Sequence, residues 1–297
     1  MTTAVSPPMD AVVPRPPSPQ LVQIRELVYQ VAGIFQPDNK LKQFEERCRK
    51  RMQALGVGSL KEYYDCLTIK ASRQAEMVSL LNEITVGETF FFRNQPQLDA
   101  LRNVVLPRVL EGRTKMPLRH LRIWSAGCST GEEPYTLSIV LTEELGGRLR
   151  GWTFEVVATD LNENSVARAR AGLYGTYSTR NLSPQAIKKY FTPAGENLQV
   201  NTEIKAHVSI TRVNLLDDAR MAFLKGFDII MCCNVLIYFD VQSKRRVIQH
   251  FYNNLLSHGY LFLGHSESLY GISQDFQLVH LPSATAYVKA QRRQLFA

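Results

Sequence analysis

The chain has 297 residues, of which 45% are hydrophobic and 21% charged, a composition typical of a folded protein with one large or two modest domains. Its formal net charge of +8 predicts an acidic partner, but charge alone does not choose between nucleic acid, an anionic membrane and an acidic protein surface. No apolar run reaches the roughly 18 residues that a membrane span needs, and the start of the chain lacks the pattern of a secretion signal. The sequence therefore predicts a cytoplasmic protein without membrane insertion.

The cysteines also favour a cytoplasmic protein. The chain has five, and Cys232 and Cys233 are adjacent within an apolar run, which favours reduced, buried thiols over a disulfide framework. No Cys-x-x-Cys pair and no His/Cys cluster with the spacing of metal ligands occurs, so we expect no metal site.

The first part of the chain divides into a leader, a helical domain and a linker. Residues 1–20 contain six prolines and few bulky apolar side chains, which predicts a flexible leader. Residues 21–85 carry apolar side chains at helical spacing, which predicts an all-helical domain with a linker over residues 86–100. The clearest repeat is formed by Leu41, Phe44, Cys48, Met52 and Leu55, with Gly56 and Gly58 as the stop.

From residue 101 to residue 297 the pattern changes to short β-branched and aromatic runs separated by amphipathic stretches. This alternation predicts an α/β, Rossmann-like domain with a parallel sheet. It pauses between about residues 172 and 208, where prolines and polar residues predict a small inserted subdomain. Near the end, "FQLVHL" and "TAYVKA" predict an antiparallel hairpin at the sheet edge.

The segment Gly127-Cys-Ser-Thr-Gly131 fits two incompatible motifs. As G-x-S-x-G it would be the nucleophile elbow of an esterase, with Ser129 as nucleophile and Asp228 and His265 downstream. Its place after the first parallel strand, without a glycine-rich oxyanion segment before it, argues against that interpretation. As a strand-to-helix turn it lies where an open parallel sheet binds its ligand, and Gly127 allows a close backbone approach.

Acidic residues indicate what this turn binds. Glu132 and Glu133 at the helix start would repel a pyrophosphate, so we expect a positively charged ligand. S-adenosylmethionine has a sulfonium and an ammonium but no phosphate, and Glu133 is the candidate for the ammonium. The alternative is that both glutamates only complement the helix dipole. Asp160 ends the next strand, where a carboxylate can accept both ribose hydroxyls.

Four segments, "ETFFFRN", "GCSTGEEPYT", "ATDLNENSVARARAGLYG" and "CCNVLIYFD", occur in this order, and with them the chain resembles the CheR family of chemotaxis receptor methyltransferases over about residues 21–290. The resemblance implies a helical N-terminal domain, a linker and a Rossmann-like domain with a β-subdomain insert. It also implies methyl transfer from S-adenosylmethionine to glutamate side chains on receptor cytoplasmic helices, with S-adenosylhomocysteine as product.

The resemblance further implies roles for single residues. Some relatives have an asparagine at the position of Gly87, so we expect only a backbone contact there. The cofactor-binding candidates are Gly87, Thr89, Arg93, Gly127, Glu133, Asp160, Asn214, Leu215, Cys232, Cys233 and Asn234.

Arg93 and Tyr238 are the candidates for catalysis. A glutamate acceptor is already ionised, so positioning and desolvation must supply the rate, and Arg93 would orient the incoming carboxylate. The Tyr238 hydroxyl would bind the acceptor or line the methyl channel, unless Tyr238 is a core aromatic with its hydroxyl at the surface. Val235 and Leu236 stand where base-methylating enzymes have prolines, which argues against a nucleobase acceptor.

Outside the catalytic segments, the helix "NKLKQFEERCRKRMQALG" has one apolar face and basic residues over the rest, which is usual for a solvated surface. The alternative is a surface that docks a glutamate-rich receptor bundle. The docking candidates are Lys40, Arg47, Lys50 and Arg51.

The segment "YFTPAGENLQVNTEI" is shorter than in relatives that bind a tethering peptide at the receptor's C-terminal end, so we expect independence from that tether. Two other functions remain open at this stage: a nucleic-acid methyltransferase, and a non-catalytic adaptor that senses the cofactor.

Overall fold

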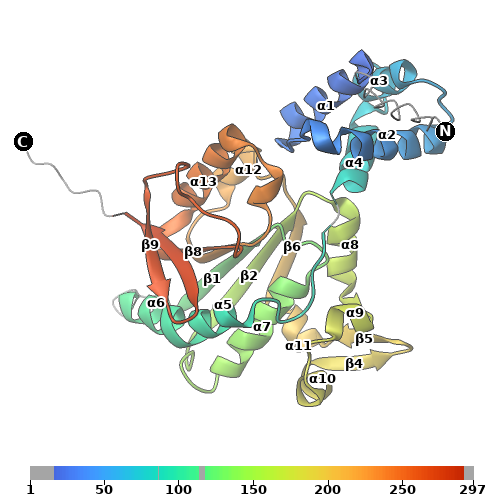
Figure 1. Ribbon diagram of the computed structural model, residues 1–297. Coiled ribbons are helices and arrows are strands. Elements are labelled where there is room, and N and C mark those ends of the chain that lie inside the picture. Colours follow the sequence, from blue (N-terminus) through green and yellow to red (C-terminus); the bar gives the residue numbers. More distant parts are fainter. Residues whose placement is uncertain (1–16, 86, 114–117, 291–297) are drawn as a thin grey trace, which may run out of the picture.

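The computed structural model describes residues 17–85, 87–113 and 118–290, so residues 1–16 of the predicted leader lie outside the described residues. A small helical domain lies beside a larger α/β domain, as Figure 1 shows. The helices of the small domain are α1 (Pro19–Ala32), the short 3-10 turn η1 (Asp38–Lys40), α2 (Leu41–Leu55), α3 (Leu60–Thr68) and α4 (Arg73–Ile84).

Local sequence explains where these helices begin and end. Ser18 caps α1 by accepting a hydrogen bond from the amide of Leu21, and Pro19 occupies the first turn, so α1 takes the last two residues of the predicted leader. Helix α2 buries four residues of the predicted apolar stripe and stops at Gly56, whose φ is 67°. Leu55, the fifth residue of that stripe, is 41% exposed at the helix end.

The larger domain is built on a seven-stranded sheet with the order β6-β2-β1-β7-β8-β10-β9. The first five strands in this order are parallel, and β10 pairs antiparallel with both β8 and β9. The predicted edge hairpin is therefore confirmed. The strands are β1 (His120–Ala126), β2 (Thr153–Asp160), β6 (Val208–Arg212), β7 (Phe227–Cys232), β8 (Leu255–Leu263), β9 (Phe276–Leu281) and β10 (Ala284–Lys289).

Helices cover both faces of the sheet, and each face has its own apolar core. On one face, Trp124 packs against Phe227 and Phe251 at ring-centre distances of 5.3 and 5.2 Å. The helices over this face are α12 (Asp218–Phe223) and α13 (Val241–Asn254). The other face carries α5 (Gln95–Ala100), η2 (Leu101–Val105), α6 (Leu106–Gly112) and α7 (Glu132–Glu144). Helix α5 therefore begins inside the predicted linker.

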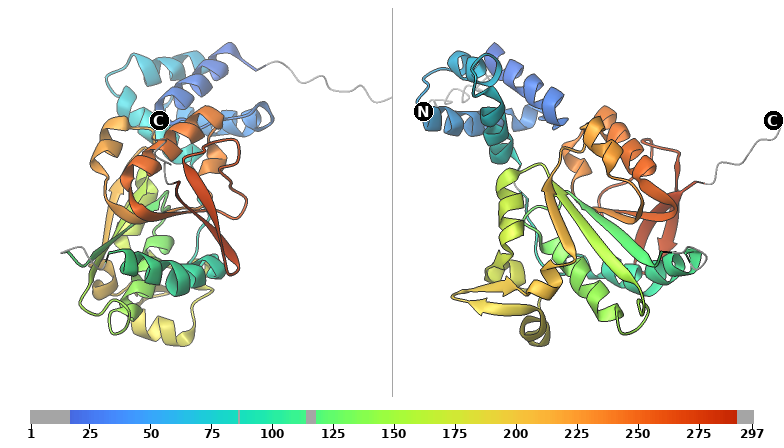
Figure 2. Two further views of the ribbon diagram at one scale, coloured as in Figure 1. Left: turned by 90° about the vertical axis from the view of Figure 1, so that its left-hand side faces the viewer. Right: turned by 180° about the vertical axis from the view of Figure 1, so that it is seen from behind.

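The predicted insert is a three-stranded antiparallel sheet with the order β3-β5-β4, surrounded by short helices. Its elements are β3 (Leu173–Tyr174), α9 (Thr176–Thr179), α10 (Pro184–Tyr190), β4 (Phe191–Ala194), β5 (Asn197–Val200) and α11 (Thr202–Lys205). It packs around Phe91 of the linker, whose ring meets those of Tyr174 and Phe191 edge to face. Helix α8 (Glu163–Ala171) runs between the insert and the helical domain, as the rear view in Figure 2 shows.

The helical domain is attached at the carboxyl edge of the sheet. Ile34 forms a β-bridge with Phe239, and the amide of Phe35 donates to the carbonyl of Tyr238 at 2.9 Å. The Asn162 side chain donates to the carbonyls of Asn82 and Thr85 at the end of α4, at 3.0 and 2.8 Å. These polar contacts fix the helical domain over the ends of the parallel strands. Within the described residues, no helix is both long and apolar enough to cross a membrane.

Candidate active site

A cavity of about 730 Å³ opens at the carboxyl ends of β1, β2 and β7. Its walls come from the turns that follow these strands and β6, from the linker, and from Ala32 and Ile34 of the helical domain. This is the position at which open α/β sheets bind their ligands, and the volume falls within the about 300–1,000 Å³ usual for small-molecule sites.

The turn after β1 brings backbone against the cavity. Gly127 has a φ of 78°, and a Cβ atom on it would lie 2.3 Å from Cγ2 of Val235, so this position requires glycine. Ser129 also has a positive φ, 49°, and its amide donates to Asp160 Oδ2 at 2.8 Å. The first turn and the end of β2 therefore hold each other in place.

The two glutamates at the start of α7 have different environments. Glu132 is 1% exposed and accepts hydrogen bonds from Thr130 Oγ1 and Ser178 Oγ at 2.7 and 2.8 Å, so it belongs to the protein's internal packing. Glu133 lines the cavity and accepts from Ser125 Oγ at 2.6 Å. Burial raises the pKa of the Glu133 carboxyl, and the hydrogen bond from Ser125 and the charge of Arg93 offset this in part. A cation in the cavity would stabilise its ionised form.

Asp160 ends β2 and lines the same cavity. Its Oδ1 accepts from the amide of Asn162 at 2.8 Å, and its Oδ2 accepts from the amide of Ser129. Burial raises the pKa of the Asp160 carboxyl, and the backbone donors lower it. A carboxylate has about four acceptor positions, so each oxygen keeps capacity for a ligand hydroxyl.

Arg93 and Tyr238 both line the cavity and are both exposed, so they lie at its mouth. The Arg93 guanidinium donates to the carbonyl of Glu88 at 2.5 Å. Burial raises the pKa of the Tyr238 hydroxyl, and the Arg93 charge opposes that rise, so the two side chains interact electrostatically. Tyr238 is 39% exposed, so its side chain is not fully enclosed in the core. Its hydroxyl stays protonated at neutral pH and can donate.

The floor of the cavity differs in part from the prediction. Cys233 and Asn234 line it, but Cys232 is fully buried in the apolar core on the α13 side of the sheet. The expectation of a cavity contact for Cys232 fails because successive strand side chains point to opposite faces.

Glu267 is a residue that sequence reasoning missed. Its carboxylate accepts from the amides of Asn234 and Gly264 at 2.8 and 2.7 Å, and from the amide of Ile237 at 3.2 Å. Asn234, with a φ of 62°, depends on such support. A glutamate four residues after the end of β8 was the available signal, because that end lies at the same sheet edge as the cavity.

The remaining cofactor candidates also line the cavity: Gly87, Thr89, Asn214 and Leu215. The Asn214 amide group is used within the protein, because its Nδ2 donates to the carbonyl of Val31 at 2.7 Å and its Oδ1 accepts from the amide of Leu216 at 3.0 Å. A ligand at this end would therefore meet the Asn214 backbone and the Leu215 side chain.

The residues present fit S-adenosylmethionine. Glu133 suits an ammonium, and Asp160 suits ribose hydroxyls. The cavity wall also offers a hydroxyl oxygen without a hydrogen-bond partner in the described part of the chain. Ser129 Oγ is buried at the cavity wall and makes no hydrogen bond to the residues that the structure describes. A buried hydroxyl without a partner costs free energy, which a polar ligand atom would recover.

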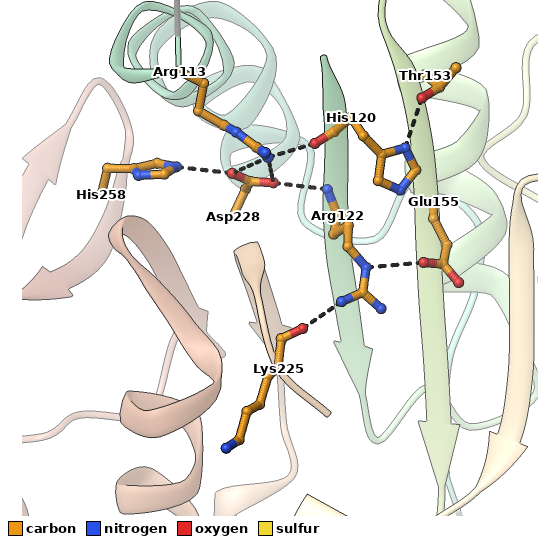
Figure 3. A network of polar contacts seen from close by, with 8 residues as sticks. All are labelled: Arg113, His120, Arg122, Thr153, Glu155, Lys225, Asp228 and His258. Atoms are coloured by element: carbon orange, nitrogen blue, oxygen red, sulfur yellow. Dashed lines mark hydrogen bonds and ion pairs between the residues drawn. The ribbon is translucent and has the colours of Figure 1, made fainter. Parts of the chain in front are cut away.

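The esterase alternative fails on geometry. Ser129 and His265 both line the cavity, but Asp228 lies near the start of β7, at the opposite end of the strand. There its carboxylate binds Arg113 Nη1 at 3.0 and 2.8 Å and His258 Nε2 at 3.0 Å, as Figure 3 shows. Asp228, the acid that this alternative requires, is therefore not available to form a triad with Ser129 and His265.

The basic residues of α2 do not reach the cavity. Lys50 pairs with Glu83 at 2.8 Å, and Arg51 binds both carboxylate oxygens of Glu76 at 3.0 and 2.7 Å. Glu76 is 4% exposed and also accepts from the hydroxyl of Tyr63, so Arg51 stabilises the helical domain from within. Lys40 and Arg47 make no ion pair with the described residues.

The strand order and the acidic cavity at the carboxyl edge define an α/β, Rossmann-like methyltransferase. Residues 87–285 match the family model "CheR methyltransferase, SAM binding domain", and residues 19–85 match "CheR methyltransferase, all-alpha domain". The chain belongs to the CheR methyltransferase family, and its cofactor is S-adenosylmethionine. The predicted family, fold class, enzyme class and cofactor are thereby confirmed.

Named relatives agree with the family match. The chain is 34% identical to chemotaxis protein methyltransferase 2 of Vibrio cholerae serotype O1, over 91% of this chain and 92% of that protein. It is 34% identical to chemotaxis protein methyltransferase 1 of Pseudomonas aeruginosa, over 89% and 95%. The crystal structure of magnesium protoporphyrin IX methyltransferase from Synechocystis PCC 6803 covers 76% of this chain and 94% of its own at 14% identity, but its TM-score of 0.36 is too low to bear on function.

Proposed function

We propose that this protein transfers a methyl group from S-adenosylmethionine to glutamate side chains on the cytoplasmic helices of chemoreceptors. The products are glutamyl methyl esters and S-adenosylhomocysteine, and the reaction serves chemotaxis adaptation. The observation that carries the proposal is the position of Arg93, a cation at the mouth of a cavity whose inner wall holds Glu133 and Asp160. The acids suit the donor, and the cation suits a carboxylate acceptor.

The cofactor, when bound, supplies a methyl group on a positively charged sulfur. A glutamate side chain has an ordinary pKa of about 4.3 and is ionised at neutral pH, so the protein supplies no general base for this acceptor. The chain contributes binding, orientation and exclusion of water.

Each contribution has its residues. Glu133 holds the donor's ammonium, Asp160 accepts the ribose hydroxyls, and the hydroxyl of Ser129 meets a polar atom of the same ligand. Arg93 orients the acceptor carboxylate by a charge-assisted pair, and the protonated Tyr238 hydroxyl donates to that carboxylate from the other side of the mouth. Glu267 holds the turn that carries Asn234 and Tyr238.

Two features bear on how the receptor is engaged. Of the four docking candidates, Lys40 and Arg47 remain available to an acidic helical bundle, whereas Lys50 and Arg51 are paired. Strands β4 and β5 are joined by only two residues, Gly195 and Glu196, which supports methylation without a receptor tethering peptide. The acceptor implies that the protein works in the cytoplasm.

The test is methyl transfer by the full chain from methyl-labelled S-adenosylmethionine to purified receptor signalling domains, with and without their C-terminal extensions. We expect label on receptor glutamates that mild alkali releases as methanol, at equal rates with both forms. Arg93→Ala should abolish transfer. Stable label in RNA or DNA offered in the same reaction, with none on receptors, would contradict the proposal. Tight cofactor binding without any transfer would favour the adaptor alternative.

A further inference from the structure

A second arginine lies beside the catalytic mouth. Arg180 follows α9 of the insert, and its guanidinium carbon is 3.6 Å from the ring centre of Phe90 and 3.9 Å from that of Tyr177. Phe90 lines the donor cavity, and the Arg93 guanidinium lies 5.7 Å from the centre of the same ring. Two guanidinium groups therefore lie near the ring of Phe90: that of Arg93 from the linker and that of Arg180 from the insert.

The contacts around Arg180 fix its place relative to the mouth. The amide of Phe91 donates to the carbonyl of Ser178 at 2.9 Å, and the Tyr177 hydroxyl donates to the carboxylate of Glu88. Arg180 itself donates to the carbonyl of Tyr177 at 2.5 Å. Because α9 and the linker are joined in this way, Arg180 and Arg93 belong to one local framework.

The charges in this framework are not balanced by internal pairing. Neither Arg93 nor Arg180 has a carboxylate oxygen within ion-pair distance among the described residues. The carboxylate of Glu88, which accepts from the Tyr177 hydroxyl, provides one negative charge near two guanidinium groups, so an excess of positive charge remains. Aromatic faces attract each cation, but the two cations repel each other, so anionic groups at this place would be stabilised.

We propose that Arg180 forms a second carboxylate subsite, outside the donor cavity, which binds an acidic side chain of the acceptor helix other than the glutamate that is methylated. The inference rests on the proposed function, because it concerns the same acceptor. On a helix, neighbouring side chains on one face are about one turn, or about 5.4 Å, apart. The guanidinium carbons of Arg93 and Arg180 lie 5.7 and 3.6 Å from the centre of one ring, so they are close enough to bind acids about one turn apart on a helix.

In this proposal, Arg93 and Arg180 have different functions. Arg93 orients the reacting carboxylate, and Arg180 selects helices that carry a further acid about one turn from it. Arg180 is exposed and lies outside the cavity lining, but it packs on Phe90, which lines the cavity, so the affinity for S-adenosylhomocysteine reports whether its removal disturbs the donor site. The insert then acts in recognition of the acceptor without any tethering peptide.

The experiment compares Arg180→Ala, Arg180→Lys and Arg180→Glu in the full chain. The control is Arg150→Ala, because Arg150 is an exposed arginine just before β2, at the opposite edge of the sheet. The acceptors are a receptor signalling domain and a version of it in which acids about one turn from each methylated glutamate are changed to glutamine. The readouts are KM for the receptor, kcat, and the affinity for S-adenosylhomocysteine.

We expect Arg180→Ala to raise KM for the receptor about 10-fold or more, since a charge-assisted hydrogen bond contributes about 1.5–3 kcal/mol, with kcat and S-adenosylhomocysteine affinity unchanged. Arg180→Glu should raise KM further, and Arg180→Lys should keep part of the interaction. The glutamine receptor should show the same rise with the unmodified enzyme but no further rise with Arg180→Ala, as coupled groups do. Arg150→Ala should match the unmodified enzyme.

Three results would overturn the inference. An unchanged KM in Arg180→Ala, while the unmodified enzyme methylates receptors, would refute the subsite and leave the proposed function standing. Weaker S-adenosylhomocysteine binding in Arg180→Ala would show that Arg180 only holds Phe90 in place. No transfer to any receptor by the unmodified enzyme would remove the proposed function and the subsite with it.

Discussion

Gly87 faces the hydroxyl of Ser129 so closely that a Cβ atom on Gly87 would lie 2.3 Å from Ser129 Oγ. The linker and the turn after β1 are therefore in direct contact across the edge of the donor cavity. Position 87 takes glycine because the serine already occupies the space, and a larger side chain there would push the linker away from the cofactor.

The first prediction follows from this contact. Gly87→Asn should weaken S-adenosylhomocysteine binding about 10- to 100-fold, because overpacking of this kind costs about 1–3 kcal/mol. Adding Ser129→Gly should recover much of the loss, and calorimetric titration measures both effects. Gly58→Asn is the matched control, since a Cβ at Gly58 meets nothing within 4 Å. Equal affinities for Gly87→Asn and the unmodified protein would show that the linker moves freely.

The second prediction concerns pH. Burial raises the pKa of Glu133 in the free protein, and a bound ammonium would favour the ionised carboxylate and lower that pKa. Binding then releases protons wherever the free carboxyl is partly protonated, so affinity is full above the raised pKa and falls as the pH drops through it.

Titrations with S-adenosylhomocysteine between about pH 4.5 and 7.5, in two buffers of different ionisation enthalpy, would measure this proton release. Glu133→Gln should bind more weakly and keep only the part of the pH dependence that belongs to Asp160, whose pKa burial also raises. An affinity that increases as the pH falls would contradict the assignment of Glu133 to the ammonium.

The third prediction separates catalysis from donor binding. Glu267 accepts three backbone amides around the turn that carries Asn234 and Tyr238. Glu267→Ala should lower kcat about 10- to 1,000-fold, since small displacements of a positioned group cost about 100-fold, with a smaller loss of S-adenosylhomocysteine affinity. Glu267→Gln should restore part of the rate because its amide oxygen still accepts. Steady-state kinetics with a receptor domain would test both variants. An unchanged kcat in Glu267→Ala would show that the turn carrying Asn234 and Tyr238 keeps its conformation without Glu267.

The fourth prediction concerns stability alone. Asp228 is fully buried between Arg113 and His258 at the far end of the sheet. Asp228→Asn should lower the free energy of unfolding by about 3–5 kcal/mol, because it leaves a buried guanidinium without its counter-charge.

Denaturant unfolding would measure that loss, while S-adenosylhomocysteine affinity in the native protein should not change. Asp218→Asn at the exposed pair with Arg246 is the control and should alter stability far less, since water screens that pair. Equal effects of the two substitutions would mean that the Asp228 network contributes no more than a surface contact.

Much of the fold and of the cavity is predictable from local sequence signals. Strand runs, helix spacing and the place of the first strand-to-helix turn are properties of short segments, and Glu133 and Asp160 follow from them because both stand where a parallel strand ends or the next helix begins. The family segments add Arg93 and Tyr238, both of which line the cavity.

Other features depend on partners distant in the sequence. In the sequence, Arg51 is only one basic residue of an amphipathic helix. Its partner Glu76 is 25 positions further on, and only the folded structure shows that the two side chains are paired. The contact between Gly87 and Ser129 joins two segments that only the folded chain brings together. Cys232 was misplaced for a local reason, because the side-chain direction in β7 depends on the exact register of the strand.

The bridge between Ile34 and Phe239 has a consequence for how this protein responds to its donor. Ala32 and Ile34 form part of the cavity wall, so a bound donor is enclosed by both domains and strengthens the seam between them. Loading and release of the donor should therefore be visible far from the chemistry, as slower amide hydrogen exchange along the last turn of α1 in the loaded protein. Hydrogen exchange in the small helical domain would then report whether the donor is bound.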